Sequence, residues 1–232
     1  MSRITLFAIV IILIACSSKE NKKAIHGEQE SDSSKNMNIS LIPIEDFDDL
    51  VKKWEDPERV NWQNPEKVFE KMGNLAGKIV ADIGIGTGYF AFRLVRKGAY
   101  VIGIDIEEKF IEYIEDRKSD LPEELSNRII TRLTVPDEPN LKPNEVDWVL
   151  IVNTFYILDN RRSYLRKVLQ GLKSGGRLII VDYKMGNMPV GPLEDEKITI
   201  NQATTEIQNA GFKIIETDEL SLQYQYIIVA EK

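Results

Sequence analysis

The sequence predicts an α/β fold in which a mostly parallel sheet is covered by helices on both faces. Apolar segments between residues 78 and 183 alternate with segments whose apolar residues recur at helical spacing. These segments are apolar throughout rather than at every second residue, as in strands that are buried on both faces. The last two strand-like segments have no helix between them. We therefore expect them to pair as an antiparallel hairpin at one edge of the sheet.

Each element follows from the local pattern of apolar and turn residues. In the amino-terminal part, acidic residues precede apolar positions at helical spacing, which predicts two short helices joined by a loop that carries Pro and Trp. Further along the chain, glycines end several of the periodic segments and mark the ends of helices. The expected helices are residues 45–53, 65–72, 88–98, 107–118, 160–176 and 199–212. The expected strands are residues 78–84, 99–106, 128–135, 146–153, 177–183, 213–220 and 222–231.

Composition excludes several classes of function. The chain has 232 residues, 43% hydrophobic and 29% charged, which suits one globular domain with appendages. The net charge of −7 argues against nucleic acid as a partner, because a surface that binds nucleic acid is basic. A single Cys and a single His exclude a disulfide framework and a Cys/His zinc site within one chain. We therefore expect no metal site.

The amino terminus carries the pattern of an export signal. Arg3 precedes an apolar run over residues 4–15, which is too short to span a bilayer but suits the apolar region of a signal peptide. The run ends on Leu-Ile-Ala-Cys, which resembles the lipobox of bacterial lipoproteins and implies cleavage before Cys16 and acylation of that residue. The alternatives are a buried apolar helix or an uncleaved anchor. The resemblance implies a lipid-anchored protein of the bacterial cell envelope, or a cytoplasmic one if the signal is not processed.

The domain organisation follows from this pattern. Residues 1–15 are expected to be the signal peptide. Residues 16–38 are rich in Ser, Lys, Glu and Asn, and they contain too few large apolar residues to fold, so they are predicted to be a flexible tether. Residues 39–232 are predicted to form one domain, with a helical cap over 39–76 and an α/β core over 77–232. Membrane attachment is expected through Cys16 alone.

A glycine-rich turn follows the first predicted core strand. Residues 82–88 read Asp-Ile-Gly-Ile-Gly-Thr-Gly, and Asp105 ends the next strand 23 residues after the first Asp. Ligands of open α/β sheets bind beyond the carboxyl ends of the strands, and glycines allow the backbone to approach a ligand closely. A carboxylate at Asp105 is able to accept both hydroxyls of a ribose. The dinucleotide pattern GxGxxG would require glycine at position 89, where this chain has Tyr89.

The spacing DxGxGxG, with an acidic residue at the end of the second strand, resembles class I S-adenosylmethionine-dependent methyltransferases. The segment Leu-Lys-Ser-Gly-Gly over residues 172–176 is similar to the turn that precedes the fifth strand in that family. The resemblance covers approximately residues 60–232. It implies a Rossmann-like fold with seven strands in the order 3-2-1-4-5-7-6, strand 7 antiparallel, and S-adenosylmethionine as cofactor.

The resemblance also implies roles for individual residues. Asp82 would approach the methionine amino group, the glycines would admit the methionine and the sugar, and Asp105 would bind the ribose hydroxyls. Ile106 would lie against the adenine face. At the position where many members of the family carry an Asp for the adenine edge, this chain has Val135, followed by Asp137 as a possible substitute. The cofactor-binding candidates are Asp82, Gly84, Gly86, Gly88, Asp105, Ile106, Val135, Asp137 and Asn153.

The methyl acceptor is expected to be a small molecule. Methyl transfer from a sulfonium needs alignment more than it needs a fixed set of catalytic residues, so the sequence points to no definite base. Asn153, Tyr156 and Asp182 follow the fourth and fifth core strands and are the candidates for the acceptor side. The frame Asn-x-x-Tyr at residues 153–156 is only weakly similar to the Asn-Pro-Pro-Tyr motif of amino-group methyltransferases, because both prolines are missing. For Asp182 a purely structural role in the turn is the alternative.

Two segments are candidates for a lid. Trp54 and Trp62 precede the core and would cover the cofactor or pack on the sheet edge, and the loop over residues 184–198 is long for a compact domain. The leading hypothesis is a lipid-anchored methyltransferase. The alternative is a lipid-anchored binding module that retains an adenosyl-nucleoside site without turnover. A nicotinamide-dependent oxidoreductase is disfavoured by the residue at position 89.

Overall fold

The computed structural model describes residues 44–232, which belong to a compact unit that spans residues 38–232. The predicted signal peptide, Cys16 and the predicted tether lie outside the described residues. Within the described part of the chain, none of the helices has the length and apolar character that crossing a membrane requires.

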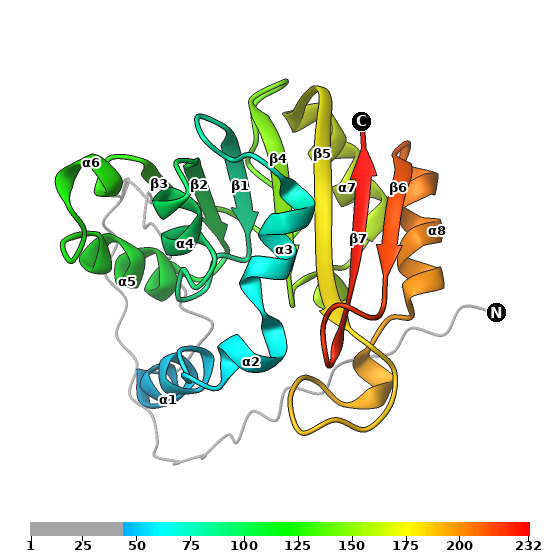
Figure 1. The fold of residues 1–232 in the computed structure, drawn as a ribbon, viewed down its shortest axis with the longest axis horizontal. Helices are drawn as coiled ribbons and strands as arrows, with labels where there is room; N and C mark the ends of the chain where they lie inside the picture. Colours follow the sequence, from blue (N-terminus) through cyan, green and yellow to red (C-terminus); the bar gives the residue numbers. More distant parts are fainter. Residues whose placement is uncertain (1–43) are drawn as a thin grey trace, which may run out of the picture. The chain divides into compact units, whose positions relative to one another are not determined.

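A seven-stranded sheet forms the centre of the fold (Figure 1). Its order is β3-β2-β1-β4-β5-β7-β6, which confirms the order that the family resemblance implies. The first five strands run parallel, and β7 pairs antiparallel with both β5 and β6. The strands are β1 Ile79–Ile83, β2 Tyr100–Asp105, β3 Ile129–Leu133, β4 Val146–Val152, β5 Leu172–Tyr183, β6 Lys213–Asp218 and β7 Gln225–Glu231.

Helices cover both faces of this sheet. The α-helices are α1 Ile44–Trp54, α2 Arg59–Gln63, α3 Pro65–Met72, α4 Ala91–Arg96, α5 Glu108–Lys118, α6 Glu123–Ser126, α7 Arg161–Gly171 and α8 Ile200–Ala210. Two short 3₁₀ turns, η1 Phe155–Ile157 and η2 Glu194–Glu196, lie in the loops that follow β4 and β5. Figure 1 shows α4 and α5 beside the β3 end of the sheet and α8 beside β6.

Alternate residues of the strands build two separate apolar cores. Val80 of β1 packs in one core with Leu94 of α4 and Ile114 of α5. Its neighbour Ala81 belongs to the other core, which includes Leu165 of α7. Successive side chains of a strand point to opposite faces, so continuous apolar strands are what a sheet with two covered faces requires.

The structure corrects one expected boundary. The helix expected over residues 160–176 ends at Gly171, and β5 already begins at Leu172. Residues 173–176 form an irregularity in the β4–β5 pairing, within which Gly175 adopts φ +71°. Ser174, Gly175 and Gly176 are poor helix formers, and glycine adopts a left-handed backbone conformation without steric penalty. The short helices α2 and α6 were not expected, because five and four residues are too few to show an apolar period.

Candidate active site

The glycine-rich loop leaves the carboxyl end of β1 and is tied to β2. The Gly84 amide donates to the Ile104 carbonyl at 2.8 Å, and the Ile85 amide donates to the same oxygen at 3.1 Å. Gly84, Gly86 and Gly88 have φ values of +73°, +51° and +78°, a region that side chains rarely adopt. The loop therefore turns sharply beside the end of β2.

The three glycines face different surroundings. A Cβ on Gly84 would overlap the Thr154 side chain, and a Cβ on Gly88 would lie 2.5 Å from Ile114 and 2.6 Å from Phe92. Gly88 is thus packed against the core, whereas Gly84 and Gly86 border a cavity. The role predicted for Gly88 in cofactor contact remains a prediction.

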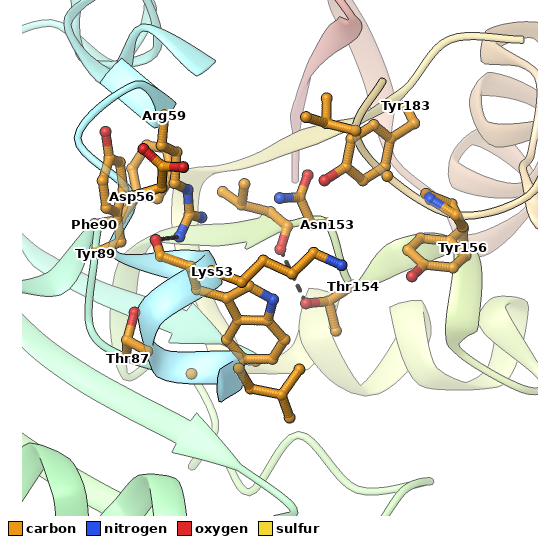
Figure 2. Close-up of a pocket in the computed structure, with 18 of the residues that line it drawn as sticks. Lys53, Asp56, Arg59, Thr87, Tyr89, Phe90, Asn153, Thr154, Tyr156 and Tyr183 are labelled. Atoms are coloured by element: carbon orange, nitrogen blue, oxygen red, sulfur yellow. Dashed lines mark hydrogen bonds between the residues drawn. The ribbon is translucent and has the colours of Figure 1, made fainter. Parts of the chain in front are cut away.

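A cavity of about 560 Å³ lies beyond the carboxyl ends of β1, β4 and β5. This size is in the usual range for small-molecule sites. Figure 2 shows residues of α1 and α2 on one side of it and Tyr156 and Tyr183 on the other. Of the residues singled out in the sequence, those that line it are Trp54, Trp62, Asp82, Gly84, Gly86, Asn153 and Tyr156, and Tyr183 lines it as well. The other candidates lie outside its lining: Gly88, Asp105, Ile106, Val135, Asp137 and Asp182.

Asp82 is the buried acidic group of this cavity. Only 3% of it is exposed, and its carboxylate accepts a hydrogen bond from the Ala91 amide. Burial and, to a smaller extent, the nearby Asp105 carboxylate raise the pKa of Asp82 to about 8, against the opposing effect of Arg59. A ligand that brings a positive charge to this carboxylate would therefore favour its ionised form.

Asp105 is held by backbone amides at the end of β2. Its Oδ2 accepts from the Gly86 amide at 3.0 Å, and its Oδ1 accepts from the Glu107 amide at 3.0 Å. Burial raises the pKa of Asp105, while these hydrogen bonds act in the opposite direction. The carboxylate thus fixes the glycine loop against β2, and each oxygen keeps acceptor capacity for a further donor.

Helix α1 covers the part of the loop next to Asp105. A Cβ on Gly86 would lie 3.1 Å from the Trp54 ring, and this ring stacks on Phe110 with centroids 5.0 Å apart. The Thr87 hydroxyl donates to the Glu55 carboxylate at 2.5 Å. The side chain of Trp54 therefore covers Gly86, whose amide is bound by Asp105.

Arg59 enters the cavity from α2 (Figure 2). Its guanidinium carbon lies 4.0 Å from the centre of the Tyr89 ring, and its Nη1 donates to the Trp54 carbonyl at 2.6 Å. Its Nε donates to Gln63, and burial lowers the pKa of Arg59. The sequence analysis missed this residue, because its position depends on how the segment before the core folds back over the glycine loop.

The acceptor side is built from β4, β5 and the loop after β5. Asn153 has φ +56°, and its Oδ1 accepts a hydrogen bond from Gln225. The rings of Tyr156 and Tyr183 have centroids 6.4 Å apart at 78°, and Trp62 lies 6.4 Å from Tyr183 at 31°. These aromatic groups line the cavity together.

Asp182 serves the structure of this region. Its Oδ2 accepts from the Tyr156 amide at 2.9 Å, and its Oδ1 accepts from the Tyr183 amide at 2.8 Å. Burial raises the pKa of Asp182 to about 7, and these amide hydrogen bonds oppose the rise. The carboxylate joins the ends of β4 and β5, behind the tyrosines that face the cavity.

The residues expected around adenine lie further out. Ile106 and Val135 are 39% and 62% exposed, and Asp137 is also exposed. The Asp137 carbonyl accepts from Lys167 at 2.6 Å, so the loop after β3 is tied to α7. Among residues 44–232, no cluster of three His, Cys, Asp or Glu side chains is placed to hold a metal ion.

Comparisons with known proteins agree with this geometry. Residues 81–180 match the model of a family described as a methyltransferase domain. The chain is 25% identical over 150 residues to a ubiquinone biosynthesis O-methyltransferase of Aeromonas salmonicida, with 62% of each chain covered. It is 31% identical over 121 residues to a demethylmenaquinone methyltransferase of Tropheryma whipplei, covering 52% of this chain and 48% of that one. The chain thus spans less than two thirds of the length of these relatives.

The fold is shared with solved structures. A SAM-dependent methyltransferase from Aquifex aeolicus superposes with a TM-score of 0.73 at 24% identity, covering 79% of this chain and 97% of that one. At this level of identity the likeness concerns the fold.

Proposed function

We infer from the methyltransferase domain at residues 81–180 that this protein is an S-adenosylmethionine-dependent methyltransferase. One observation carries the inference within the structure. A buried carboxylate, Asp82, and a partly buried guanidinium, Arg59, border one cavity at the glycine loop that leaves β1. Arg59 suits the carboxylate of a methionine moiety, and Asp82, once ionised by the approach of a cation, suits its ammonium.

The donor set fits the cofactor at its methionine end. Because burial raises the pKa of Asp82, its ionised form lacks sufficient counter-charge in the protein alone, and a ligand ammonium would supply it. Arg59 offers a planar group suited to a carboxylate. Gly84 and Gly86 leave the backbone accessible between them.

At the adenosyl end, Asp105 would accept the ribose hydroxyls through its remaining acceptor capacity. Ile106, Val135 and Asp137 would surround the adenine. Because the Trp54 ring lies against Gly86, we propose that α1 shifts when the ribose binds.

The cofactor supplies an electrophilic methyl carbon on a positively charged sulfur when bound. The chain would contribute alignment and exclusion of water. Asn153 and Thr154 sit where β4 ends and face the cavity, and the loop after β5 closes it opposite α1. Asp182 would act as a positioning residue, because its oxygens hold the amides of Tyr156 and Tyr183.

The acceptor is proposed to be a small molecule that enters between α2 and the loop after β5. The two relatives are named for ubiquinone biosynthesis and for demethylmenaquinone, so a quinone-type ring is one acceptor to test. Membrane attachment through Cys16 is a separate proposal. Palmitate labelling that is lost in Cys16→Ser, together with processing that globomycin blocks, would support it, and labelling that persists would contradict it.

Calorimetric titration with S-adenosylhomocysteine tests the cofactor site. One-to-one binding, followed by methyl transfer to an acceptor panel, is expected. Binding with no transfer to any acceptor would favour the binding module instead. Binding of NAD in place of S-adenosylhomocysteine would overturn the proposal.

A further inference from the structure

The acceptor end of the cavity has a chemical character of its own. Three aromatic rings from three elements line it: Trp62 of α2, Tyr156 of η1 and Tyr183 of β5. The Tyr156 and Tyr183 rings meet nearly at right angles, at 78°, so they present surfaces in different directions. The face of an aromatic ring carries negative potential and attracts cations.

The hydroxyl groups of these tyrosines remain uncharged near neutral pH. Burial raises the pKa of Tyr183 and of Tyr156, and the carboxylates of Asp182 and Glu196 raise that of Tyr156 further. Neither hydroxyl therefore forms a phenolate that would act as a base. Their electrostatic contribution comes from the ring faces and from the neutral hydroxyl.

A carboxylate completes this end of the cavity. Glu196, at the end of η2, lines the cavity and lies close enough to Tyr156 to raise the pKa of its hydroxyl. Its Oε2 accepts from the Leu193 amide at 2.9 Å, which fixes the side chain in the loop. A Cβ on Gly191 would lie 2.6 Å from the Tyr183 ring, so this loop packs directly on the aromatic wall.

We propose that the methyl acceptor is an amine that arrives as a cation and is bound by Trp62, Tyr156, Tyr183 and Glu196. The proposal rests on the methyltransferase function inferred above and names its substrate class. Aromatic faces beside a carboxylate stabilise an ammonium group. A phenolate or another anionic acceptor would be repelled by Glu196. Two cations, Lys53 of α1 and Arg59 of α2, also line the cavity, and Arg59 is near enough to Tyr183 to oppose the rise in the pKa of its hydroxyl. The proposal therefore requires that the methionine carboxylate of the bound cofactor neutralises Arg59.

The transfer step balances with these groups. The ammonium gives one proton to the Glu196 carboxylate, which is exposed and passes it to water. The freed nitrogen lone pair then forms a bond to the methyl carbon, while the bond from that carbon to sulfur breaks and leaves its electron pair on sulfur. The products are a methylated ammonium and a neutral thioether.

A binding experiment with two matched probes tests the proposal. Choline and 3,3-dimethyl-1-butanol have nearly the same shape, but only choline is charged. In the full chain saturated with S-adenosylhomocysteine, calorimetry or ligand-observed NMR should show choline binding at least about tenfold more tightly, because cation–π and carboxylate contacts act only on the cation. Equal affinities would overturn the proposal.

Two variants locate the effect. Glu196→Gln keeps an oxygen for the Leu193 amide and should reduce the preference for choline severalfold. The control is Glu194→Gln in the same 3₁₀ turn. Glu194 accepts a hydrogen bond from the Gly186 amide and does not line the cavity, so this substitution should leave the preference for choline unchanged. An unchanged preference in Glu196→Gln, in a protein that still binds S-adenosylhomocysteine, would remove Glu196 from the site.

Turnover distinguishes acceptor classes. With labelled S-adenosylmethionine, benzylamine should be methylated in preference to catechol. Transfer to catechol with no transfer to benzylamine would overturn this inference and leave the methyltransferase function intact. If S-adenosylhomocysteine does not bind at all, the proposed function fails first, and this inference fails with it.

Discussion

The two halves of the site differ in how the protein fills them. Around Asp105, the Trp54 ring lies on Gly86 and stacks on Phe110, and the carboxylate is engaged by two amides. Around Asp82 and Tyr183, a cavity of about 560 Å³ is open between the glycine loop and the loop after β5. In the proposed site, the half for the methionine and the acceptor is therefore open before ligands bind, whereas the half for the adenosyl group would require α1 to move.

The two halves of the proposed site would therefore contribute differently to ligand binding. In the proposed site the Arg59 guanidinium is in place before a ligand binds, whereas the Asp82 carboxyl loses its proton when a ligand ammonium arrives. Closure by α1 on the other side would couple cofactor binding to the order of the segment before the core. The predictions below separate the two contributions.

The largest effect is expected at the preformed half. Arg59→Met should weaken S-adenosylhomocysteine binding by about 2–3 kcal/mol, the scale of a lost hydrogen bond to a charged group. Arg93→Met is the matched control, because Arg93 lies 3.7 Å from the centre of the same Tyr89 ring and does not line the cavity. Calorimetry on both variants measures the difference, and equal losses would remove the carboxylate role of Arg59.

A smaller loss is expected at Asp105. Asp105→Asn should weaken S-adenosylhomocysteine binding by about 1–2 kcal/mol, because an amide keeps one acceptor but loses the charge-assisted contacts to the ribose. Asp182→Asn controls for structural damage, since Asp182 also binds two backbone amides at a strand end and lies outside the cavity lining. An affinity unchanged in Asp105→Asn would exclude the ribose contact.

Binding at the Asp82 side should depend on pH. Because the pKa of Asp82 is raised to about 8, the ligand-free protein holds a proton there at neutral pH. A ligand ammonium favours the ionised form, so affinity should increase as the pH rises towards 8, by up to about tenfold per unit, with proton release on binding. Calorimetry in buffers of different ionisation enthalpy measures that proton. Asp82→Asn should abolish the release, and persistence of the release in this variant would assign it elsewhere.

The raised pKa of Asp82 also makes the free energy of unfolding depend on pH. An unfolded Asp titrates near pH 3.9, so between about pH 4 and pH 8 the folded chain binds the extra proton. The free energy of unfolding of the ligand-free protein should therefore fall as the pH rises through this window. Urea unfolding should show a smaller slope in Asp82→Asn than in the wild type, because Asp182, whose pKa is also raised, still contributes in this window.

The smallest signal is expected from α1. In a Trp62→Phe background, the remaining tryptophans are Trp54 and the buried Trp148, which is 5% exposed. Addition of S-adenosylhomocysteine should change the fluorescence of Trp54, because its ring must leave Gly86 or stack on the ligand. A spectrum that does not change while the ligand binds would show that α1 stays in place.

The sequence was sufficient for the parts that depend on local pattern. Continuous apolar strands predicted a sheet covered on both faces, and the last two strands predicted the antiparallel hairpin at its edge. The strand order came from the resemblance to class I methyltransferases, which rests on the glycine-rich turn and the spacing from Asp82 to Asp105. The predicted end of α7 was wrong. Leu172 pairs with Val146 in the sheet, where the local pattern had suggested that the helix continues.

Other features depend on contacts between distant segments. Arg59 comes to the cavity because α2 folds over Tyr89, and no local period marks a helix of five residues. The structural role of Asp182 rests on the Tyr156 amide, 26 residues away in the chain, as well as on the amide of its neighbour Tyr183. Glu196 reaches the aromatic wall through a loop whose path no pattern of residues defines.

The most direct test is calorimetric titration of S-adenosylhomocysteine into the full chain and into Arg59→Met and Arg93→Met. The proposed site predicts one-to-one binding to the wild type and to Arg93→Met, and a clear loss in Arg59→Met. A wild-type chain that does not bind the ligand, or that binds it equally well without the Arg59 guanidinium, would contradict it.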